Sequence, residues 1–297
     1  MENKPLISIA LCTYNAGPYL EKQLFSILEQ SYENIEIVVV DDCSTDGTYE
    51  RLEKLKENHP KIRTYKNDVN LGFNKNFEKA IGLCQGEYIA ISDQDDIWLP
   101  HKLEVLANNI GDNWLIFSNS ELIDIDEIPL NIQILKPDFS LSNRSFKGIL
   151  MYNSVTGHTT LFSRPFIEQF LPIPKKGYYD WWMGFVAIYH HKATCINQCL
   201  TLHRMHNASV IGKAYGEDKK ATKSTLNTEL ETQLQEFVFY KNLKEEDKKL
   251  IKKIKCSYQK RFSLFFIGLM VFHYPEYFPD LKPRNWFSRL FFALRFK

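Results

Sequence analysis

The chain has 297 residues, of which 44% are hydrophobic and 25% are charged, so its composition excludes a disordered protein. A net charge of +1 gives no general reason to expect a nucleic-acid partner, and none is predicted. No apolar run of about 18 residues predicts a transmembrane helix, and the N-terminus lacks the pattern of a signal peptide. The six cysteines form no C-x-x-C pair, as expected of reduced thiols in a cytoplasmic protein.

The first hundred residues alternate between short apolar runs and amphipathic stretches. The apolar runs predict β-strands at residues 6–12, 35–42, 62–67 and 87–92. Helical spacing of apolar residues, with Pro or Gly near the ends, predicts helices within residues 17–31, 44–60 and 70–86. Strand and helix repeated in this way predict an α/β protein with a mostly parallel sheet and helices on both faces.

The pattern becomes less regular beyond residue 112. Strands are predicted within residues 114–123, 159–163 and 192–206, and a helix over residues 178–191. Residues 217–256 are charged and helical in pattern, and the last forty residues are basic and aromatic. We therefore predict a catalytic domain over residues 1–215, with a nucleotide-binding half (1–112) and an acceptor-binding half (113–215), followed by a helical extension over 216–297.

Three carboxylates stand within four positions at the end of the fourth predicted strand, in the segment SDQDDIW. They are Asp93, Asp95 and Asp96. Clustered carboxylates repel each other unless a cation joins them, and a hard divalent ion such as Mg²⁺ or Mn²⁺ takes oxygen ligands. The alternative is an acidic loop that caps the next helix, although one cap does not need three carboxylates.

The first two predicted strands also end in polar residues, CTYN and DDCSTD. In a parallel sheet the carboxyl ends of the strands face one crevice, where ligands bind. No Gly-rich phosphate loop of either common type is present, so a phosphate would have to be held by a metal and side chains. The pattern therefore favours a metal–diphosphate site over a dinucleotide site.

Five segments together resemble family 2 glycosyltransferases of the GT-A fold. They are SIALCTYN, IEIVVVDDCSTDGT, NLGFNKNFEKAI, GEYIAISDQDDIWLPHKLE and YYDWWM, and the resemblance covers residues 5–212. SDQDDIW and the later HRMHNASVIG are most similar to bacterial rhamnosyltransferase-like members that build surface polysaccharides. The resemblance implies a nucleotide-sugar donor, linked to dTDP or UDP, and a glycan or lipid-linked acceptor.

The resemblance also implies roles for single residues. The expected nucleotide-binding residues are Thr13, Tyr14, Asn15, Asp42, Asp93 and Lys75. The expected metal ligands are Asp95, Asp93 and His206, for Mg²⁺ or Mn²⁺. Asp180 matches the catalytic base. On the acceptor and sugar side the candidates are Tyr179, Trp181, Trp182, Asp96 and Arg204, with core packing as the alternative for the aromatic residues.

The implied activity is metal-dependent, inverting hexosyl or deoxyhexosyl transfer. A haloacid dehalogenase-type phosphatase normally carries D-x-D on its first strand, whereas here the motif follows the fourth and ends in Ile97. A nucleotidyltransferase would need a Gly-rich basic first loop, which is missing. A non-catalytic nucleotide-sugar-binding or scaffold protein of the same fold remains the alternative, although Asp180 is present.

The C-terminal segment is the most basic part of the chain. From residue 251 onward, ten Lys and Arg residues are opposed only by Glu276 and Asp280. Basic residues mixed with Trp and Phe are typical of an interfacial amphipathic helix that binds anionic lipid. We expect peripheral contact with the inner face of the cytoplasmic membrane. The alternative is a helix that packs on the catalytic domain.

Overall fold

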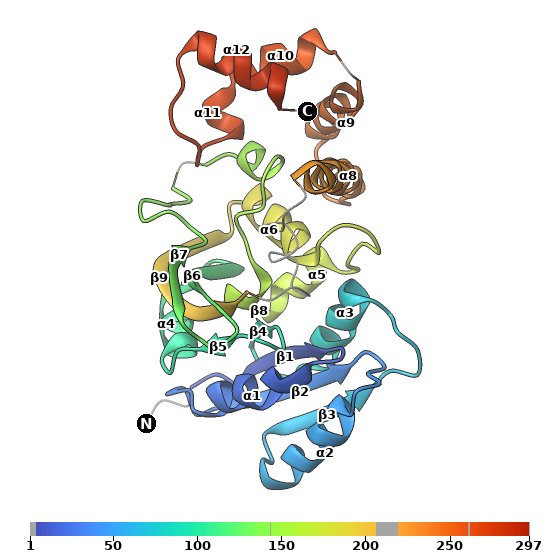
Figure 1. The fold of residues 1–297 in the computed structure, drawn as a ribbon, viewed down its shortest axis with the longest axis vertical. Helices are drawn as coiled ribbons and strands as arrows, with labels where there is room; N and C mark the ends of the chain where they lie inside the picture. The colour runs from blue at the N-terminus through green and yellow to red at the C-terminus, as the bar shows by residue number, and fades with distance from the viewer. Residues whose placement is uncertain (1–3, 143, 206–218, 261, 297) are drawn as a thin grey trace.

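The computed structural model describes residues 4–142, 144–205, 219–260 and 262–296. The molecule is elongated, with the N-terminal strands and helices at one end and the last helices, α10 to α12, at the other (Figure 1). A single mixed sheet joins the two predicted halves of the catalytic domain. The predicted boundary at residue 215 lies outside the described residues, so the domain division stays a prediction.

The strand–helix alternation predicted for the first hundred residues is confirmed. The strands are β1 Ile7–Thr13, β2 Ile35–Asp41, β3 Ile62–Lys66 and β4 Tyr88–Ser92. The helices are α1 Leu20–Leu28, α2 Thr48–Asn58, α3 Phe73–Leu83 and α4 Lys102–Asn109, with a short 3-10 turn, η1 Gly17–Tyr19, ahead of α1. These four strands are mutually parallel in the order β3-β2-β1-β4, so their carboxyl ends lie along one edge.

The sheet continues into the second half with mixed directions. Its strands are β5 Ile97–Trp98, β6 Leu115–Ile123, β7 Pro129–Gln133, β8 Thr160–Ser163 and β9 Ala193–Arg204. Strand β8 pairs antiparallel with both β4 and β6, and β9 runs parallel to β6. Four of the eight pairings are antiparallel, so the sheet is less parallel than its first half indicates. The sequence pattern gave no sign of β5 and β7, which are a two-residue strand and a fully exposed one.

The remaining elements are helical. They are η2 Phe146–Ile149, η3 Gly157–Thr159, η4 Arg164–Phe166, α5 Ile167–Phe170, α6 Tyr179–Tyr189, α8 Lys219–Val238, α9 Glu245–Gln259, α10 Leu264–Phe272, α11 Tyr274–Tyr277 and α12 Trp286–Arg295. Among the described residues, none of these helices combines the length and the apolar character that a membrane span needs.

Alternate residues of the central strands face opposite sides of the sheet. In β1, Ala10 contributes to one hydrophobic core, and Ile9 and Leu11 contribute to the other. The first core includes α3, α6 and the C-terminal helices, whereas the second includes α1 and α4. Because both faces are covered, β2 is buried over its whole length, as its unbroken apolar run predicts.

The C-terminal helices share the first core with the catalytic part of the chain. Phe237 of α8 stacks on Phe185 of α6, with ring centroids 4.1 Å apart. Ion pairs also join the two regions, from Arg144 to Asp280 at 2.7 Å and from Lys147 to Glu276 at 2.6 Å. One side of the extension is therefore packed on the domain.

Candidate functional site

The ends of β1 and β2 form one side of the site and are held together by hydrogen bonds. Thr13 Oγ1 donates to Asp41 at 2.9 Å, and Asp41 also accepts bonds from the backbone and side chain of Ser44. The Asn15 amide N–H donates to Ser44 Oγ, and Asn15 Oδ1 accepts from the Thr45 N–H. Asn15 has a φ of 48°, which Asn tolerates better than most residues.

Asp42 is buried and fully engaged by the loop that precedes α3. Its Oδ1 accepts from Asn67 Nδ2 at 2.7 Å and from the Leu71 N–H at 2.8 Å, and its Oδ2 accepts from the Gly72 N–H at 2.9 Å. A carboxylate with three such donors fixes the loop that it holds. Asp42 thus lies at the expected edge of the sheet, where it organises the loop before α3.

Tyr14 links the first strand end to the fourth. Its backbone N–H donates to Gln94 Oε1 at 2.8 Å, and Gln94 Nε2 donates back to the Tyr14 carbonyl at 3.2 Å. The Tyr14 side chain remains 51% exposed. The ring is therefore presented beside the carboxylate cluster by a fixed backbone, in a position where a planar ligand group can lie against it.

The carboxylates after β4 differ from one another in their surroundings. The pKa of Asp93 is raised well above its ordinary value by burial, and further by the negative charges of Asp96, Asp95 and, less strongly, Asp180. Burial, together with Asp93 and Asp42, also raises the pKa of the Cys12 thiol. Cys12, Asp42 and Asp93 therefore lie near one another at the strand ends, and Asp180 lies near Asp93. The sheet topology places the strand ends along this same edge.

Asp96 is fully buried beside two stacked histidines that sequence reasoning did not select. The His203 Nδ1 atom is 2.8 Å from Asp96 Oδ1, and the His158 ring stacks on the His203 ring with centroids 4.4 Å apart. Burial lowers the His203 pKa, but the charge and hydrogen bond of Asp96 outweigh this and raise it to about 9. Burial lowers the His158 pKa to about 3.

His158 and His203 come from η3 and β9, far from Asp96 in sequence. A single sequence gives no local signal for such a contact, although His203 stands in the HRMHN segment whose other members were selected. His206 of that segment, expected as a metal ligand, lies outside the described residues. Strand β9 carries His203 and pairs with β5, which begins immediately after Asp96. This pairing brings His203 close to both Asp96 and Asp93.

Arg204 is buried and directed into the protein. Its guanidinium donates to Glu127 at 3.1 Å and to the carbonyls of Asp95 and Ile125, and it lies over the Tyr19 ring. Its donors therefore brace the loop that carries the carboxylates. This arrangement favours a supporting role for Arg204 over the acceptor or sugar contact that the sequence led us to expect.

Lys75, expected to meet a diphosphate, is also engaged inside the protein. Its Nζ donates to Glu78 and to the Ile173 carbonyl, both at 2.7 Å. These bonds attach α3 to the segment before α6. Two of the three N–H donors of the Lys75 ammonium group are therefore used within the protein.

Asp180 lies at the N-terminal turn of α6. Its Oδ1 accepts from the Trp181 N–H at 2.6 Å, and its Oδ2 faces the Gly157 N–H at 3.3 Å. Burial raises the Asp180 pKa to about 6, although these N–H groups and Asn153 oppose the shift. A positioned carboxylate with a pKa near neutrality has the properties of a general base.

Gly157 is required where it stands. A Cβ atom at this position would lie 2.0 Å from the Tyr179 hydroxyl oxygen. The absence of a side chain lets η3 approach α6, so that consecutive residues contact two different carboxylates. Gly157 faces Asp180, and His158 faces Asp96.

The aromatic residues around Asp180 are buried. Trp181 Nε1 donates to the Ile149 carbonyl at 2.6 Å, and Trp182 Nε1 donates to the Phe170 carbonyl at 2.8 Å. Tyr179 packs on Phe77 with ring centroids 4.3 Å apart. These contacts favour core packing, the alternative stated above, over stacking on a sugar.

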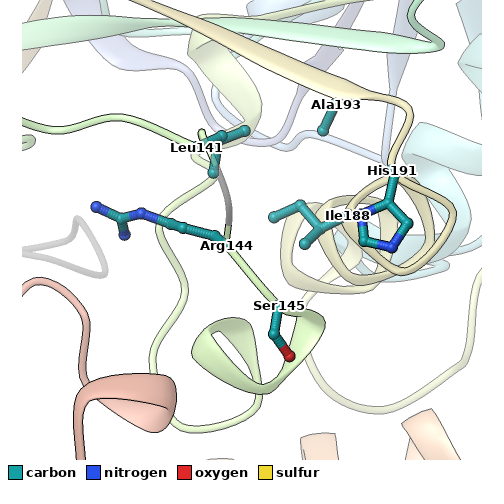
Figure 2. Close-up of a pocket in the computed structure, with 6 residues that line it drawn as sticks. All are labelled: Leu141, Arg144, Ser145, Ile188, His191 and Ala193. Carbon is teal, nitrogen blue, oxygen red and sulfur yellow. The ribbon is translucent and has the colours of Figure 1, made fainter.

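A cavity of about 530 Å³ lies elsewhere in the molecule. It is lined by Leu141, Arg144, Ser145, Ile188, His191 and Ala193 (Figure 2). The Arg144 side chain points away from Ile188 and His191. None of these residues belongs to the predicted site, so the crevice at the strand ends remains the candidate.

The residues of the crevice fit a divalent cation. Asp96 Oδ2 is buried and has no hydrogen-bond partner among the described residues, and the Asp93 carboxyl next to it has a raised pKa. Asp96, His158 and His203 lie close enough together to share an ion. Carboxylate and imidazole groups are both common metal ligands.

Known families and relatives show what the chain is similar to. The model of the family described as "Glycosyl transferase family 2" matches residues 8–170. A relative from Bacillus subtilis, the "putative teichuronic acid biosynthesis glycosyltransferase TuaG", is 28% identical over 73% of this chain and 86% of its own length. The Escherichia coli "UDP-Glc:alpha-D-GlcNAc-diphosphoundecaprenol beta-1,3-glucosyltransferase WfaP" is 27% identical over 71% of this chain and 82% of its own.

Solved structures share the fold. S. aureus TarS in complex with UDP-GlcNAc superposes with a TM-score of 0.61 at 18% identity, covering 97% of this chain and 81% of its own. The mannosyltransferase PcManGT from Pyrobaculum calidifontis, in complex with GDP-Man and Mn²⁺, gives a TM-score of 0.57 at 20% identity, covering 84% and 69%. The α/β GT-A fold predicted from the sequence is confirmed.

Proposed function

The chain belongs to glycosyl transferase family 2, and on that premise we propose that it is an inverting enzyme of bacterial surface polysaccharide synthesis. It transfers a hexose or deoxyhexose, with rhamnose as one candidate, from a dTDP- or UDP-linked donor to a hydroxyl of a glycan or lipid-linked acceptor. The names of its relatives refer to teichuronic acid synthesis and to a diphosphoundecaprenol acceptor, and they support the polysaccharide role and the lipid-linked acceptor.

The observation that carries the proposal is that Asp180 is buried and close enough to Asp93, after β4, for its charge to raise the Asp93 pKa. Asp180 accepts the proton of the acceptor hydroxyl while that oxygen attacks the anomeric carbon and the bond to the diphosphate breaks. The N–H groups of Trp181 and Gly157 hold the carboxylate in one orientation. A single displacement inverts the anomeric configuration.

The donor lies along the ends of β1, β2 and β4 in this proposal. The exposed Tyr14 ring stacks on the base, and Thr13, Asn15 and Asp42 shape the loops that surround the nucleoside. Asp93 and Asp95 would hold the Mg²⁺ or Mn²⁺ ion, with His206 as a further ligand. Such an ion supplies positive charge to the diphosphate leaving group.

Calorimetric binding of dTDP and UDP, with Mn²⁺ or with a chelator, tests the donor site. Wild-type protein is expected to bind one nucleotide in a metal-dependent manner, and Asp95→Ala is expected to lose that binding. Binding that does not need a metal would remove the ion from the proposal. The absence of nucleotide binding would contradict the donor assignment itself.

Product analysis separates catalysis from the alternative of a non-catalytic nucleotide-sugar-binding or scaffold protein. Wild-type protein and Asp180→Asn are incubated with the nucleotide sugar whose nucleotide binds and with lipid-linked acceptors. Turnover by the wild type only supports the enzyme. Equal nucleotide binding by both proteins without turnover by either would favour the scaffold.

We also propose that the last helices contact the inner face of the cytoplasmic membrane. Exposed apolar side chains gather on residues 262–294, and we call this set the C-terminal apolar surface; it comprises Phe262, Leu264, Phe272, Trp286, Phe287, Phe291 and Leu294. Helices α10 and α12 pack together at the end of the molecule away from β1–β3 (Figure 1). Basic residues of the same segment would attract anionic lipid.

Vesicle sedimentation tests this contact. The double variant Phe287→Ser/Phe291→Ser is expected to reduce sedimentation with vesicles of phosphatidylglycerol by about tenfold or more, since each buried aromatic ring contributes about 1.5–3 kcal/mol. The matched control is Phe239→Ser, because Phe239 is as exposed, at 68%, but lies outside this surface. Equal loss in both variants would contradict the proposal.

A further inference from the structure

The buried His158 ring faces two carboxylates of the segment after β4. His158 Nδ1 lies 3.7 Å from Asp93 Oδ2 and 3.8 Å from Asp96 Oδ2. Both distances are too long for a hydrogen bond. Two ligands of a shared ion, each about 2.1–2.2 Å from it, lie at most about 4.2–4.4 Å apart, so both separations are within reach of one cation.

The other side-chain atoms of Asp96 and His158 have partners, which leaves Asp96 Oδ2 and His158 Nδ1 facing each other. Asp96 Oδ1 is bonded to His203, whereas Asp96 Oδ2 has no hydrogen-bond partner among the described residues and is fully buried. His158 Nε2 is 3.1 Å from Ser120 Oγ. With the proton on Nε2, donated to Ser120, the Nδ1 lone pair faces the two carboxylates.

The segment that carries His158 is held firmly. Lys102 Nζ donates to the His158 carbonyl and to Thr201 Oγ1, and it is itself buried. The imidazole stacks on His203 with an interplanar angle of 2°. The side chain of Asp93 is 35% exposed, which gives the cluster an edge open to solvent. Hydrogen bonds to the surrounding protein hold these ligand residues in place, while one edge of the cluster is open to solvent. Such an arrangement is suited to binding an ion from solution.

We propose that His158 Nδ1, together with Asp93 and Asp96, is a ligand for the divalent cation of this site. An imidazole nitrogen in the set favours a transition cation such as Mn²⁺ over Mg²⁺, which takes oxygen ligands. His203 positions Asp96 from behind through its hydrogen bond. The inference deepens the proposed function, because it concerns the cation that the same crevice would use.

Pulsed electron paramagnetic resonance of Mn²⁺ bound to the whole chain, without nucleotide, tests the assignment. Wild-type protein is expected to show ¹⁴N modulation from a coordinated imidazole, which changes frequency when the protein is labelled with ¹⁵N-histidine. Mn²⁺ bound without nitrogen coupling would overturn the proposal. This readout needs no sugar transfer, so it fails independently of the proposed function.

Two substitutions at His158 identify the residue. His158→Gln keeps an amide near Ser120 but removes the atom at Nδ1, so Mn²⁺ affinity is expected to fall by about 10–100-fold. His158→Asn places an oxygen near the Nδ1 position, so binding is expected to persist while the contribution of His158 to the ¹⁴N coupling is lost. Melting curves check that both variants fold.

His273→Gln is the matched control, since His273 is an exposed histidine of the C-terminal helices and lies outside the site. It should keep the ¹⁴N coupling of the wild type. Coupling that persists unchanged in both His158 variants would contradict the proposal. In case neither His158 variant folds, competition in the wild type still decides, because Mg²⁺ displacing Mn²⁺ at similar concentration would contradict a nitrogen ligand.

Discussion

Carboxylate side chains stand at the carboxyl ends of strands β2 and β4, and the groups that surround them differ. At the end of β2, Asp41 and Asp42 accept hydrogen bonds from Thr13, Ser44, Asn67 and two backbone N–H groups. At the end of β4, the Asp93 pKa is raised by burial and by its neighbours, and Asp96 Oδ2 has no partner among the described residues. The first region stabilises loops, and the second is arranged for a ligand.

The comparison shows that acidic residues at strand ends fall into two groups. In one group the fold supplies hydrogen-bond donors to the carboxylate, and in the other it does not. A satisfied carboxylate contributes to the free energy of folding, whereas unsatisfied neighbouring carboxylates reduce it until a cation binds. Substitutions in the two regions should therefore have opposite signatures in stability and in activity.

The largest effect is expected at Asp180, whose raised pKa places it with the β4 carboxylates. Asp180→Asn removes the proton acceptor but keeps the shape, so kcat should fall by about 10²–10⁴. Nucleotide binding by calorimetry should stay within about twofold of the wild type. Unchanged kcat in steady-state transfer assays would remove Asp180 from the mechanism.

Asp93→Asn is expected to separate activity from stability. Transfer should fall by about 10² or more, because a metal-site carboxylate contributes several kcal/mol to the transition state. The raised pKa of folded Asp93 means that its ionisation, as pH rises, costs stability, so the variant should melt at the same or a higher temperature above pH 5. A clear drop in melting temperature would contradict the contrast between the regions.

Asp42→Ala should show the opposite signature. It leaves the donors of Asn67, Leu71 and Gly72 without their acceptor, so unfolding free energy should fall by about 1–3 kcal/mol. Denaturant titration of the variant measures this loss. Asp68→Ala, at an exposed carboxylate of the loop before α3, is the control expected to lose less.

The pH dependence of transfer should follow Asp180. Its pKa is raised to about 6, so the basic form is lost as pH falls through that value, and kcat should decline about tenfold for each pH unit below it. The rate profile from pH 5 to 8 checks this. The residual activity of Asp180→Asn should not show this decline below the Asp180 pKa.

The smallest effect is expected at Trp181. Trp181→Phe removes the hydrogen bond to the Ile149 carbonyl and should cost about 0.5–1.5 kcal/mol of stability. KM for the acceptor should stay within about twofold, since the ring is buried in the core. A large rise in KM with unchanged stability would support the sugar-stacking role instead.

The sequence by itself determined the first half of the fold and the main carboxylates. Apolar runs of period two and helical stripes are local, so β1–β4, α1–α3, the Asp93–Asp96 cluster and the position of Asp180 at a helix start can be read without a structure. Parallel strands also place their carboxyl ends together, which predicted one crevice.

Only the tertiary structure decided which polar groups are satisfied. His158 and His203 reach Asp96 across long separations in sequence, and Arg204, Lys75, Trp181 and Trp182 prove to be engaged within the protein. The physical reason is that hydrogen bonding and burial depend on what surrounds an atom in space, whereas a sequence pattern reports only its neighbours along the chain.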